Sequence, residues 1–330
     1  MLNIMLLTFD SYAQIPDKLH IFYSNAFETM FFKHDATKSG FKRQLKSDLS
    51  FDDFKNVFSI FCFHTYMKEQ YQFSYSELSS LLDEINKQRF SFIPSDFISD
   101  LTDSVCVMFK DGLNYCFSHR SFQEYFTALH IQNISDQQQS RVFKYIFNNP
   151  TCSSDKLTLI EMLIDMSQDR FEKNTFIEIL TEIENEFCGE LDLYDNYFRY
   201  LIYSVNFFLG ENGNISFGRV IDFENPNYLK IECIFNIIYR CRLQEGLIDT
   251  YNDYDFNINS AAINNIEFLF SYDNQLLLFE LIGQENSDIY QLIKGNTWIG
   301  ASINRATTLL ASIKKKQEYQ VKQLEELLSF

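Results

Sequence analysis

Glycine and proline are scarce in this chain of 330 residues, which has 10 glycines and 4 prolines against 35 phenylalanines and 19 tyrosines. Because glycine and proline break helices and form tight turns, their scarcity argues against a turn-rich β-sandwich and favours a mainly α fold. Apolar residues make up 46% of the chain, which is ample for a continuous core. We therefore expect two or three modest folded domains, or one large helical array.

Basic residues are also in short supply, with 28 Lys plus Arg against 45 Asp plus Glu and a formal net charge of −17. A chain of this charge repels phosphate backbones and anionic membranes, which disfavours DNA as a partner. The apolar start MLNIMLLTF is too short to span a bilayer and lacks the flanks of a signal peptide. We expect a cytoplasmic protein with no membrane partner.

The usual signatures of independent catalysis are missing, since the sequence contains no GxxxxGK[ST], GxGxxG, HExxH or GxSxG motif. Its seven cysteines are odd in number, widely spaced and without a CxxC pair, which indicates reduced thiols and not a zinc site. Carboxylates at helical spacing on an acidic protein usually form a solvated face. We expect no catalytic residue, no metal site and no enzymatic activity in this chain alone.

Apolar periodicity predicts helices along most of the sequence. A polar, basic connecting loop is expected at 33–48, Ser74 with Glu77 has the spacing of a capping box, and Pro94 begins a short helix. A turn and a short strand are expected within 211–220, and no motif repeats, so a solenoid is a hypothesis about arrangement alone. The expected helices cover 2–13, 17–32, 51–68, 75–86, 94–104, 121–130, 140–147, 156–167, 174–187, 195–209, 227–243, 264–270, 274–283 and the stretch from about 298.

The segment VCVMFKDGLNYCFS has the alternation of a β-hairpin. A loop of Asp111 and Gly112 alone would set Phe109 opposite Asn114, whereas a three-residue loop from Lys110 to Gly112 sets Phe109 opposite Leu113. The second register places six apolar residues on one face, so we predict a three-residue turn with Gly112 left-handed. Three helices followed by a hairpin make a winged helix, and the next helix is expected to begin at Ser121, capped by Ser121 and Glu124.

His119 lies at the corner between the hairpin and the next helix, and two interpretations apply to it. In the first, it continues the inward face of the strand and is packed with both nitrogens satisfied. In the second, it uses its place at a helix N-terminus, where an anion is favoured, to donate a hydrogen bond to a phosphate. His20, His34, His64 and His130 have no comparable context.

The stretch FSHRSFQEYFTALHI resembles the winged-helix signature of NACHT-type STAND NTPases, the NLR-like nucleotide switches of innate immunity. The residues that match the signature are Phe117, His119, Phe122, Gln123, Glu124, Tyr125, Phe126 and Ala128. The segments AFETMFFKHDATKSGFKRQL and FSYSELSSLL are also similar to bacterial NACHT proteins, so the resemblance covers about residues 1–135.

The resemblance implies that His119 contacts the β-phosphate of ADP in the resting state. The family's phosphate-binding loop, magnesium-binding strand and sensor arginine have no counterpart here, and the chain looks like the carboxyl-terminal half of such a protein. ADP or ATP would then bind only together with a separate NTPase half, in cis or in trans. The implied domains are the end of a NACHT-associated helical domain at 1–50, a winged helix at 51–135 and a helical sensor at 136–330.

On this interpretation the chain serves bacterial antiviral (antiphage) defence, recognises a protein trigger such as a phage protein, and assembles into an oligomer on activation. The alternative is a helical adaptor or winged-helix scaffold that binds proteins without nucleotide. DNA binding is disfavoured because the candidate recognition helix, 76–87, carries Glu77, Asp83 and Glu84 against Lys87.

Overall fold

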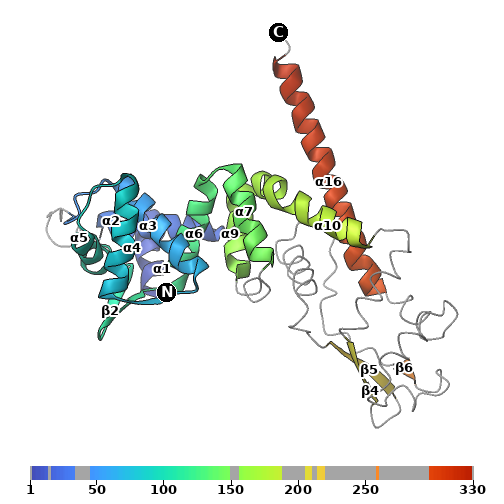
Figure 1. Ribbon diagram of the computed structural model, residues 1–330, viewed down its shortest axis with the longest axis horizontal. Helices are drawn as coiled ribbons and strands as arrows, with labels where there is room; N and C mark the ends of the chain where they lie inside the picture. Colours follow the sequence, from blue (N-terminus) through green and yellow to red (C-terminus); the bar gives the residue numbers. More distant parts are fainter. Residues whose placement is uncertain are drawn as a thin grey trace. The chain divides into compact units, whose positions relative to one another are not determined.

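The computed structural model of the chain (Figure 1) describes residues 2–13, 16–33, 45–148, 156–187, 205–209, 214–219, 258–259 and 297–328. The helices predicted at 227–243, 264–270 and 274–283 lie outside the described residues, as does 34–44 of the predicted basic loop. Contacts group the chain into two compact units, the first made of 1–142 with 156–171 and the second of 143–155 with 172–330. The predicted boundaries at residues 50 and 135 remain predictions.

Helices dominate the first unit, which confirms the mainly α prediction. Their bounds are α1 Leu2–Tyr12, α2 Leu19–Lys33, α3 Phe51–Met67, α4 Tyr75–Arg89, α5 Pro94–Ser99, the π-helical turn η1 Asp100–Ser104, α6 Arg120–Asn133, α7 Asp136–Asn148 and α9 Leu157–Phe171. The chain passes into the second unit part-way along α7.

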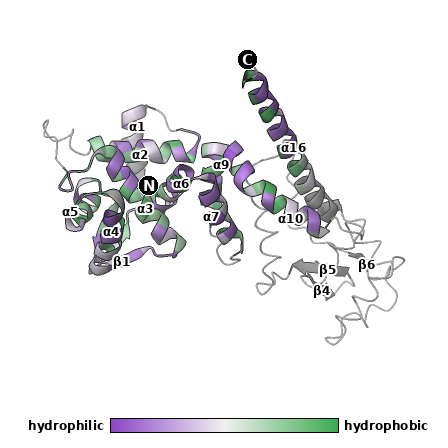
Figure 2. Ribbon diagram, turned by 45° about the horizontal axis from the view of Figure 1, so that its top comes forward, coloured by the Kyte–Doolittle hydropathy of each residue, from purple (hydrophilic) through white to green (hydrophobic). Residues whose placement is uncertain are grey.

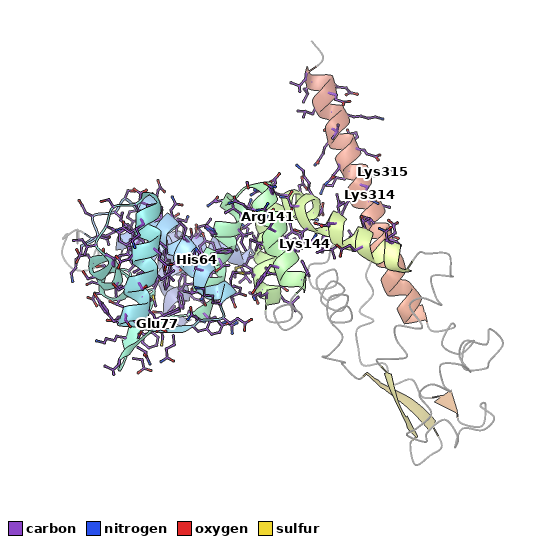
Figure 3. The ribbon with its side chains drawn as sticks, viewed as in Figure 1. His64, Glu77, Arg141, Lys144, Lys314 and Lys315 are labelled. Atoms are coloured by element: carbon purple, nitrogen blue, oxygen red, sulfur yellow. The ribbon has the colours of Figure 1, made fainter. Side chains whose placement is uncertain are left out.

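Local signals in the sequence set several helix starts. Ser74 and Glu77 form the predicted capping box of α4, with the Ser74 N–H donating to Glu77 Oε2 at 2.7 Å and the Glu77 N–H donating to Ser74 Oγ at 3.3 Å. Glu77 is labelled at this end of α4 in Figure 3. Pro94 occupies the first turn of α5, as predicted, where its missing N–H costs nothing.

A small antiparallel sheet completes the first unit. Its strands are β1 Gln72–Ser74, β2 Met108–Asp111 and β3 Asn114–Phe117, in the order β1-β3-β2. The chain order is therefore α3, β1, α4, α5, η1, β2, β3, α6, with β1 added from before α4. The sequence did not indicate β1.

The predicted hairpin register is wrong. Met108 lies opposite Phe117 and Asp111 opposite Asn114, so the turn has two residues, Gly112 and Leu113, and not three. Gly112 is left-handed with φ +61°, as predicted, and a positive φ at the first turn position alone is the pattern of a type II′ turn. The side chain of Leu113 is 86% exposed at the tip.

The register differs from the prediction because buried and exposed side chains do not alternate regularly in the residues before β2. Cys106 has φ +59°, which interrupts the extended backbone, so Val105, Val107 and Met108 are all buried. Phe109, which the prediction placed on the inward face, is 47% exposed. A backbone break of this kind cannot be read from apolar alternation, which assumes that every residue is extended.

Aromatic rings fill the core between α2, α3 and α6. Phe58 of α3 is fully buried, with its ring centroid 4.6 Å from that of Phe126 and 6.3 Å from that of Phe117. Phe27 of α2 lies 4.7 Å from Phe126 on the same centroid measure. These ring contacts pack α6, the helix that follows the hairpin, against the apolar faces of α2 and α3.

A buried carboxylate anchors the segment that enters α3. Asp100 is fully buried, and its carboxylate accepts the backbone N–H groups of Lys46 at 3.0 Å and Ser47 at 2.8 Å. The hydroxyl of Ser104 donates to the same carboxylate at 3.1 Å. Because these donors satisfy the charge, the described end of the basic loop is tied to η1.

The second unit contains the π-helical turn η3 Glu172–Phe176, α10 Ile177–Phe187, the strands β4 Val205–Leu209, β5 Asn214–Arg219 and β6 Ile258–Asn259, and α16 Thr297–Leu328. The strands form a sheet in the order β4-β5-β6. The helix predicted at 195–209 is wrong over 205–209, which is strand, while the short strand predicted within 211–220 is confirmed.

The long predicted helix from about residue 298 is confirmed as α16, along which hydrophobic and hydrophilic residues mix (Figure 2). Its buried residues Leu309, Leu310 and Ile313 lie on one face, and α16 contacts α10. Lys314 pairs with Glu184 of α10 at 3.5 Å. Among the helices that the structure describes, none is both long and apolar enough to cross a membrane.

Candidate functional site

The corner between β3 and α6 is held in place by Ser118. Its N–H donates to the Val107 carbonyl oxygen at 2.9 Å, which continues the β2–β3 ladder by one residue pair. Its hydroxyl donates to the Cys106 carbonyl oxygen at 2.7 Å. His119 follows with an extended backbone, φ −151° and ψ 128°, and α6 begins at Arg120.

His119 is the N-cap of α6. Its Nδ1 accepts a hydrogen bond from the backbone N–H of Ser121 at 3.3 Å. The predicted capping box of Ser121 and Glu124 is therefore wrong, because the helix begins one residue earlier and a ring nitrogen replaces the hydroxyl acceptor. The location of His119 at a helix start was predicted correctly, but its capping role was not.

The capping bond selects the protonation state of the ring. Nδ1 can accept from Ser121 only when it carries no proton, so a neutral His119 carries its proton on Nε2. Burial lowers the pKa of His119, which favours this neutral form. Nε2–H is then a hydrogen-bond donor, and no residue in the described part of the chain accepts from it.

The next residue, Arg120, anchors the corner from the other side. Its guanidinium lies 4.3 Å from the ring centroid of Tyr71, and its Nη2 donates to the Tyr71 hydroxyl at 3.0 Å. Its Nε also lies 3.6 Å from Glu124 Oε1, and the Glu124 side chain is only 11% exposed. Burial raises the pKa of Glu124, and Arg120 opposes that shift.

Sequence reasoning missed Arg120 and Tyr71. They lie 49 residues apart in the chain, and no local pattern connects them. The buried Gln123, which belongs to the recognised motif, makes a similar long-range connection: its Nε2 donates to Thr65 Oγ1 at 2.9 Å and to the Gln70 carbonyl oxygen at 3.0 Å. Both connections tie α6 to the segment that runs from the end of α3 to the start of β1.

Almost all of the motif is interior. Every matched residue except His119 is buried, namely Phe117, Phe122, Gln123, Glu124, Tyr125, Phe126 and Ala128. Because His119 is the one matched residue with partial exposure, it is the only one placed to reach a ligand from this corner. The other seven contribute packing and hydrogen bonds.

The other described histidines lie in different surroundings. His20, His64 and His130 all have a lowered pKa, with burial as the main cause. His64 and His130 are close enough for the charge of His64 to lower the pKa of His130, which reaches about 4. Figure 3 labels His64 on α3. His34 lies outside the described residues.

The described residues also bear on the metal site and on the DNA-recognition helix considered from the sequence. Among the residues that the structure describes, no three His, Cys, Asp or Glu side chains gather as metal ligands. On α4, the DNA-recognition candidate, Glu77, Asp83, Glu84 and Lys87 are all exposed, so its surface carries more acidic than basic groups there. A phosphate backbone would meet net repulsion along that helix.

Comparisons with known proteins add no identification. No family model, no curated protein and no solved structure matches the chain.

Proposed function

We propose that the chain is the switch and sensor portion of a bacterial NACHT-type STAND NTPase in antiviral defence. The observation that carries the proposal is the geometry of His119, which caps α6 through Nδ1 and keeps an Nε2–H donor beside the helix N-terminus. A neutral imidazole with a free N–H, next to the positive end of a helix dipole, suits a phosphate oxygen.

The order of elements supports a winged helix in the proposed domain 51–135. Helix, strand, two helices, two strands and a further helix follow one another there, and the sheet order is β1-β3-β2. In the proposal this domain presents His119 to the β-phosphate of ADP. A separate NTPase half holds the rest of the nucleotide, because the sequence has no phosphate-binding loop.

The remaining parts of the proposal follow from that role. The chain alone does not hydrolyse ATP, acts in the cytoplasm, and uses residues from about 136 onward to recognise a protein trigger. Trigger binding shifts a two-state equilibrium away from the ADP-held state, which releases the protein for assembly.

The test compares two substitutions in the protein reconstituted with its NTPase half. His119→Asn keeps an N-cap acceptor, because Asn is among the best N-cap residues, but removes the imidazole Nε2–H. His119→Ala removes both. If Nε2–H binds phosphate, both variants release ADP about tenfold faster and show activity without a trigger, since a hydrogen bond to a charged group is lost.

The outcome separates a phosphate contact from a structural cap. Faster ADP release in the Ala variant alone would mean that capping is the whole role of His119. Unchanged ADP release in both variants would contradict the proposal and favour the second candidate, a helical adaptor that binds no nucleotide. Burial of seven of the eight motif residues favours that candidate, because a packing motif needs no ligand.

A further inference from the structure

Two described segments carry the chain from the first unit to the second. One is α7, which passes the boundary after Val142, and the other is the end of α9, where the boundary follows Phe171. The helix α9 is broken at Ser167, whose φ −161° and ψ 80° are not helical, and the π-helical turn η3 follows directly. Irregular backbone on both sides therefore isolates the short stretch that contains Arg170.

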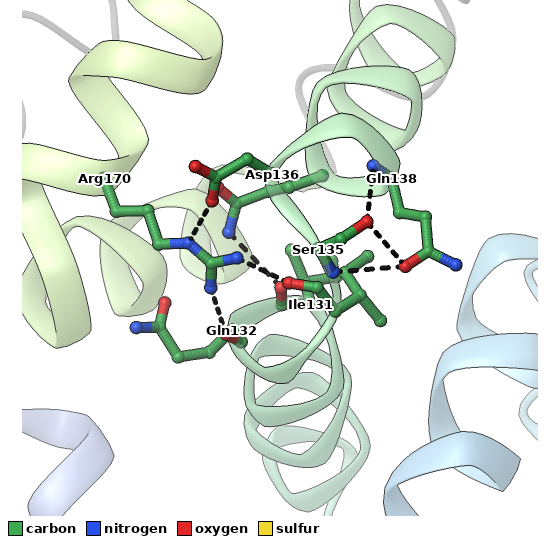
Figure 4. A network of polar contacts seen from close by, with 8 residues as sticks. Ile131, Gln132, Ser135, Asp136, Gln138 and Arg170 are labelled. Atoms are coloured by element: carbon green, nitrogen blue, oxygen red, sulfur yellow. Dashed lines mark hydrogen bonds and ion pairs between the residues drawn. The ribbon is translucent and has the colours of Figure 1, made fainter.

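Arg170 joins these two segments (Figure 4). Its Nε donates to Asp136 Oδ1 at 2.8 Å, at the start of α7. Its Nη1 donates to the carbonyl oxygen of Gln132 and its Nη2 to that of Ile134, both at the end of α6. All three nitrogens of one guanidinium are thus engaged with the α6–α7 corner.

Electrostatics favour a cation at this point. The last carbonyl groups of α6 lack partners within the helix and carry the negative end of its dipole, while Asp136 adds a full charge. Arginine is always protonated and presents several donors in one plane, which lysine cannot match. The Arg170 side chain is 24% exposed, so water screens these contacts only in part.

The start of α7 does not need Arg170 for its own cap. The Ser135 N–H donates to Gln138 Oε1 at 3.1 Å, and the Gln138 N–H donates to Ser135 Oγ at 3.3 Å, which is a complete capping box. Gln139 supplies a further bond from α7 to α6, donating to the Ile131 carbonyl oxygen at 3.2 Å. The contribution specific to Arg170 is the connection between this corner and the end of α9.

We propose that Arg170 is a latch within the first unit, holding the start of α7 against the end of α9. While the latch is closed, the two connecting segments move together. When it opens, each of these two segments moves separately. This proposal requires no nucleotide and stands apart from the role of His119.

Hydrogen–deuterium exchange of the whole chain tests the latch. Arg170→Met removes all three hydrogen bonds and should raise the hydrogen-exchange rates of segments 134–142 and 166–176 about tenfold. The exchange rates of α3 should stay unchanged. Arg170→Lys keeps the charge but cannot reach all three acceptors, so it should raise exchange in the same two segments. Asp136→Asn should raise it less, because the carbonyl acceptors remain.

Lys144→Met is the matched control. Lys144 projects from α7 (Figure 3) and pairs with Glu178 at 2.9 Å within the second unit, so its loss should leave 134–142 unchanged. Exchange at 134–142 and 166–176 that equals that of the unsubstituted protein would overturn the latch. Hydrogen exchange that is accelerated equally throughout α3 would overturn the latch as well, because Arg170 would then support the whole first unit. If Arg170→Met does not fold, the same comparison is made with Arg170→Lys and Asp136→Asn.

Discussion

Acid should destabilise the first unit through His130, a histidine in the last turn of α6. Its ring centroid lies 4.7 Å from that of Phe63. Burial, together with the charge of nearby His64, lowers the pKa of His130 to about 4 from the ordinary value of 6.5. The substitution His130→Phe removes the titrating group and replaces it with a ring that suits the aromatic contact.

The size of the effect follows from the pKa difference. Between pH 6.5 and about 4 the unfolded chain binds a proton at this residue and the folded chain does not, so stability falls as the pH falls. A difference of about 2.5 units corresponds to about 3 kcal/mol at 1.36 kcal/mol per unit. Below about pH 4 both states are protonated and His130 adds no further loss.

The free energy of opening of the first unit can be measured from the slowest-exchanging amides of α3, at about pH 7 and about pH 4. Carboxylates such as Glu77, whose pKa is lowered by its hydrogen bonds to Ser74, also destabilise the protein in acid. They contribute to both proteins and cancel in the comparison. The unsubstituted protein should therefore lose about 3 kcal/mol more than His130→Phe over this range.

Equal acid-induced losses of stability in the two proteins would refute the reasoning, because the half-buried neutral ring of His130 would then contribute nothing. The ring can also be observed directly. Its imidazole carbon-bound proton should titrate near pH 4 in nuclear magnetic resonance spectra, and the signal should be the one missing from the His130→Phe spectrum.

Three further substitutions test the fold. Ser74→Ala removes one hydroxyl of the α4 capping box and should cost about 1 kcal/mol of stability in denaturant unfolding, while Ser80→Ala on the exposed face of the same helix should cost nothing. Phe58→Ala empties the centre of the aromatic core and should cost about 3–5 kcal/mol, whereas Phe32→Ala, at a side chain 60% exposed, should cost less than about 1 kcal/mol by the same measurement. Asp100→Asn replaces one of the two accepting oxygens by an NH2 donor, so one of the two backbone N–H groups loses its acceptor; it should cost about 1–3 kcal/mol, with faster hydrogen exchange at the amide that loses its acceptor, and unchanged exchange at both amides would contradict the assigned role.

Local patterns predicted the features that depend on neighbours in sequence. The stripes of α2, α3 and α6 are buried largely as their spacing indicated, because helical periodicity places those residues on one face. The Ser74 capping box and Pro94 at the start of α5 were also correct, since each acts within one turn of helix. His119 was placed correctly at the threshold of a helix for the same reason.

The errors occur where a distant segment or a single backbone angle decides the outcome. Cys106 in the left-handed region shifted the hairpin register, although the alternation around it looks regular. The strand at 205–209 pairs with β5, whereas its apolar residues were equally compatible with a helix. The choice between the two needs a partner strand, which a short apolar run does not reveal.

By itself the sequence determined a mainly helical chain, the positions of its first helices and the presence of one histidine at a strand-to-helix corner. These follow from periodicity and capping, which act over a few residues. Only the tertiary structure decided that His119 caps α6 through Nδ1, that Arg120 stacks on Tyr71, and that Arg170 binds the end of α6. The contact of Arg120 with Tyr71 joins residues 49 positions apart, and that of Arg170 with Ile134 joins residues 36 positions apart. The capping role of His119 depends on the residue at which α6 begins, and side-chain patterns determine a helix start only to within a residue or two.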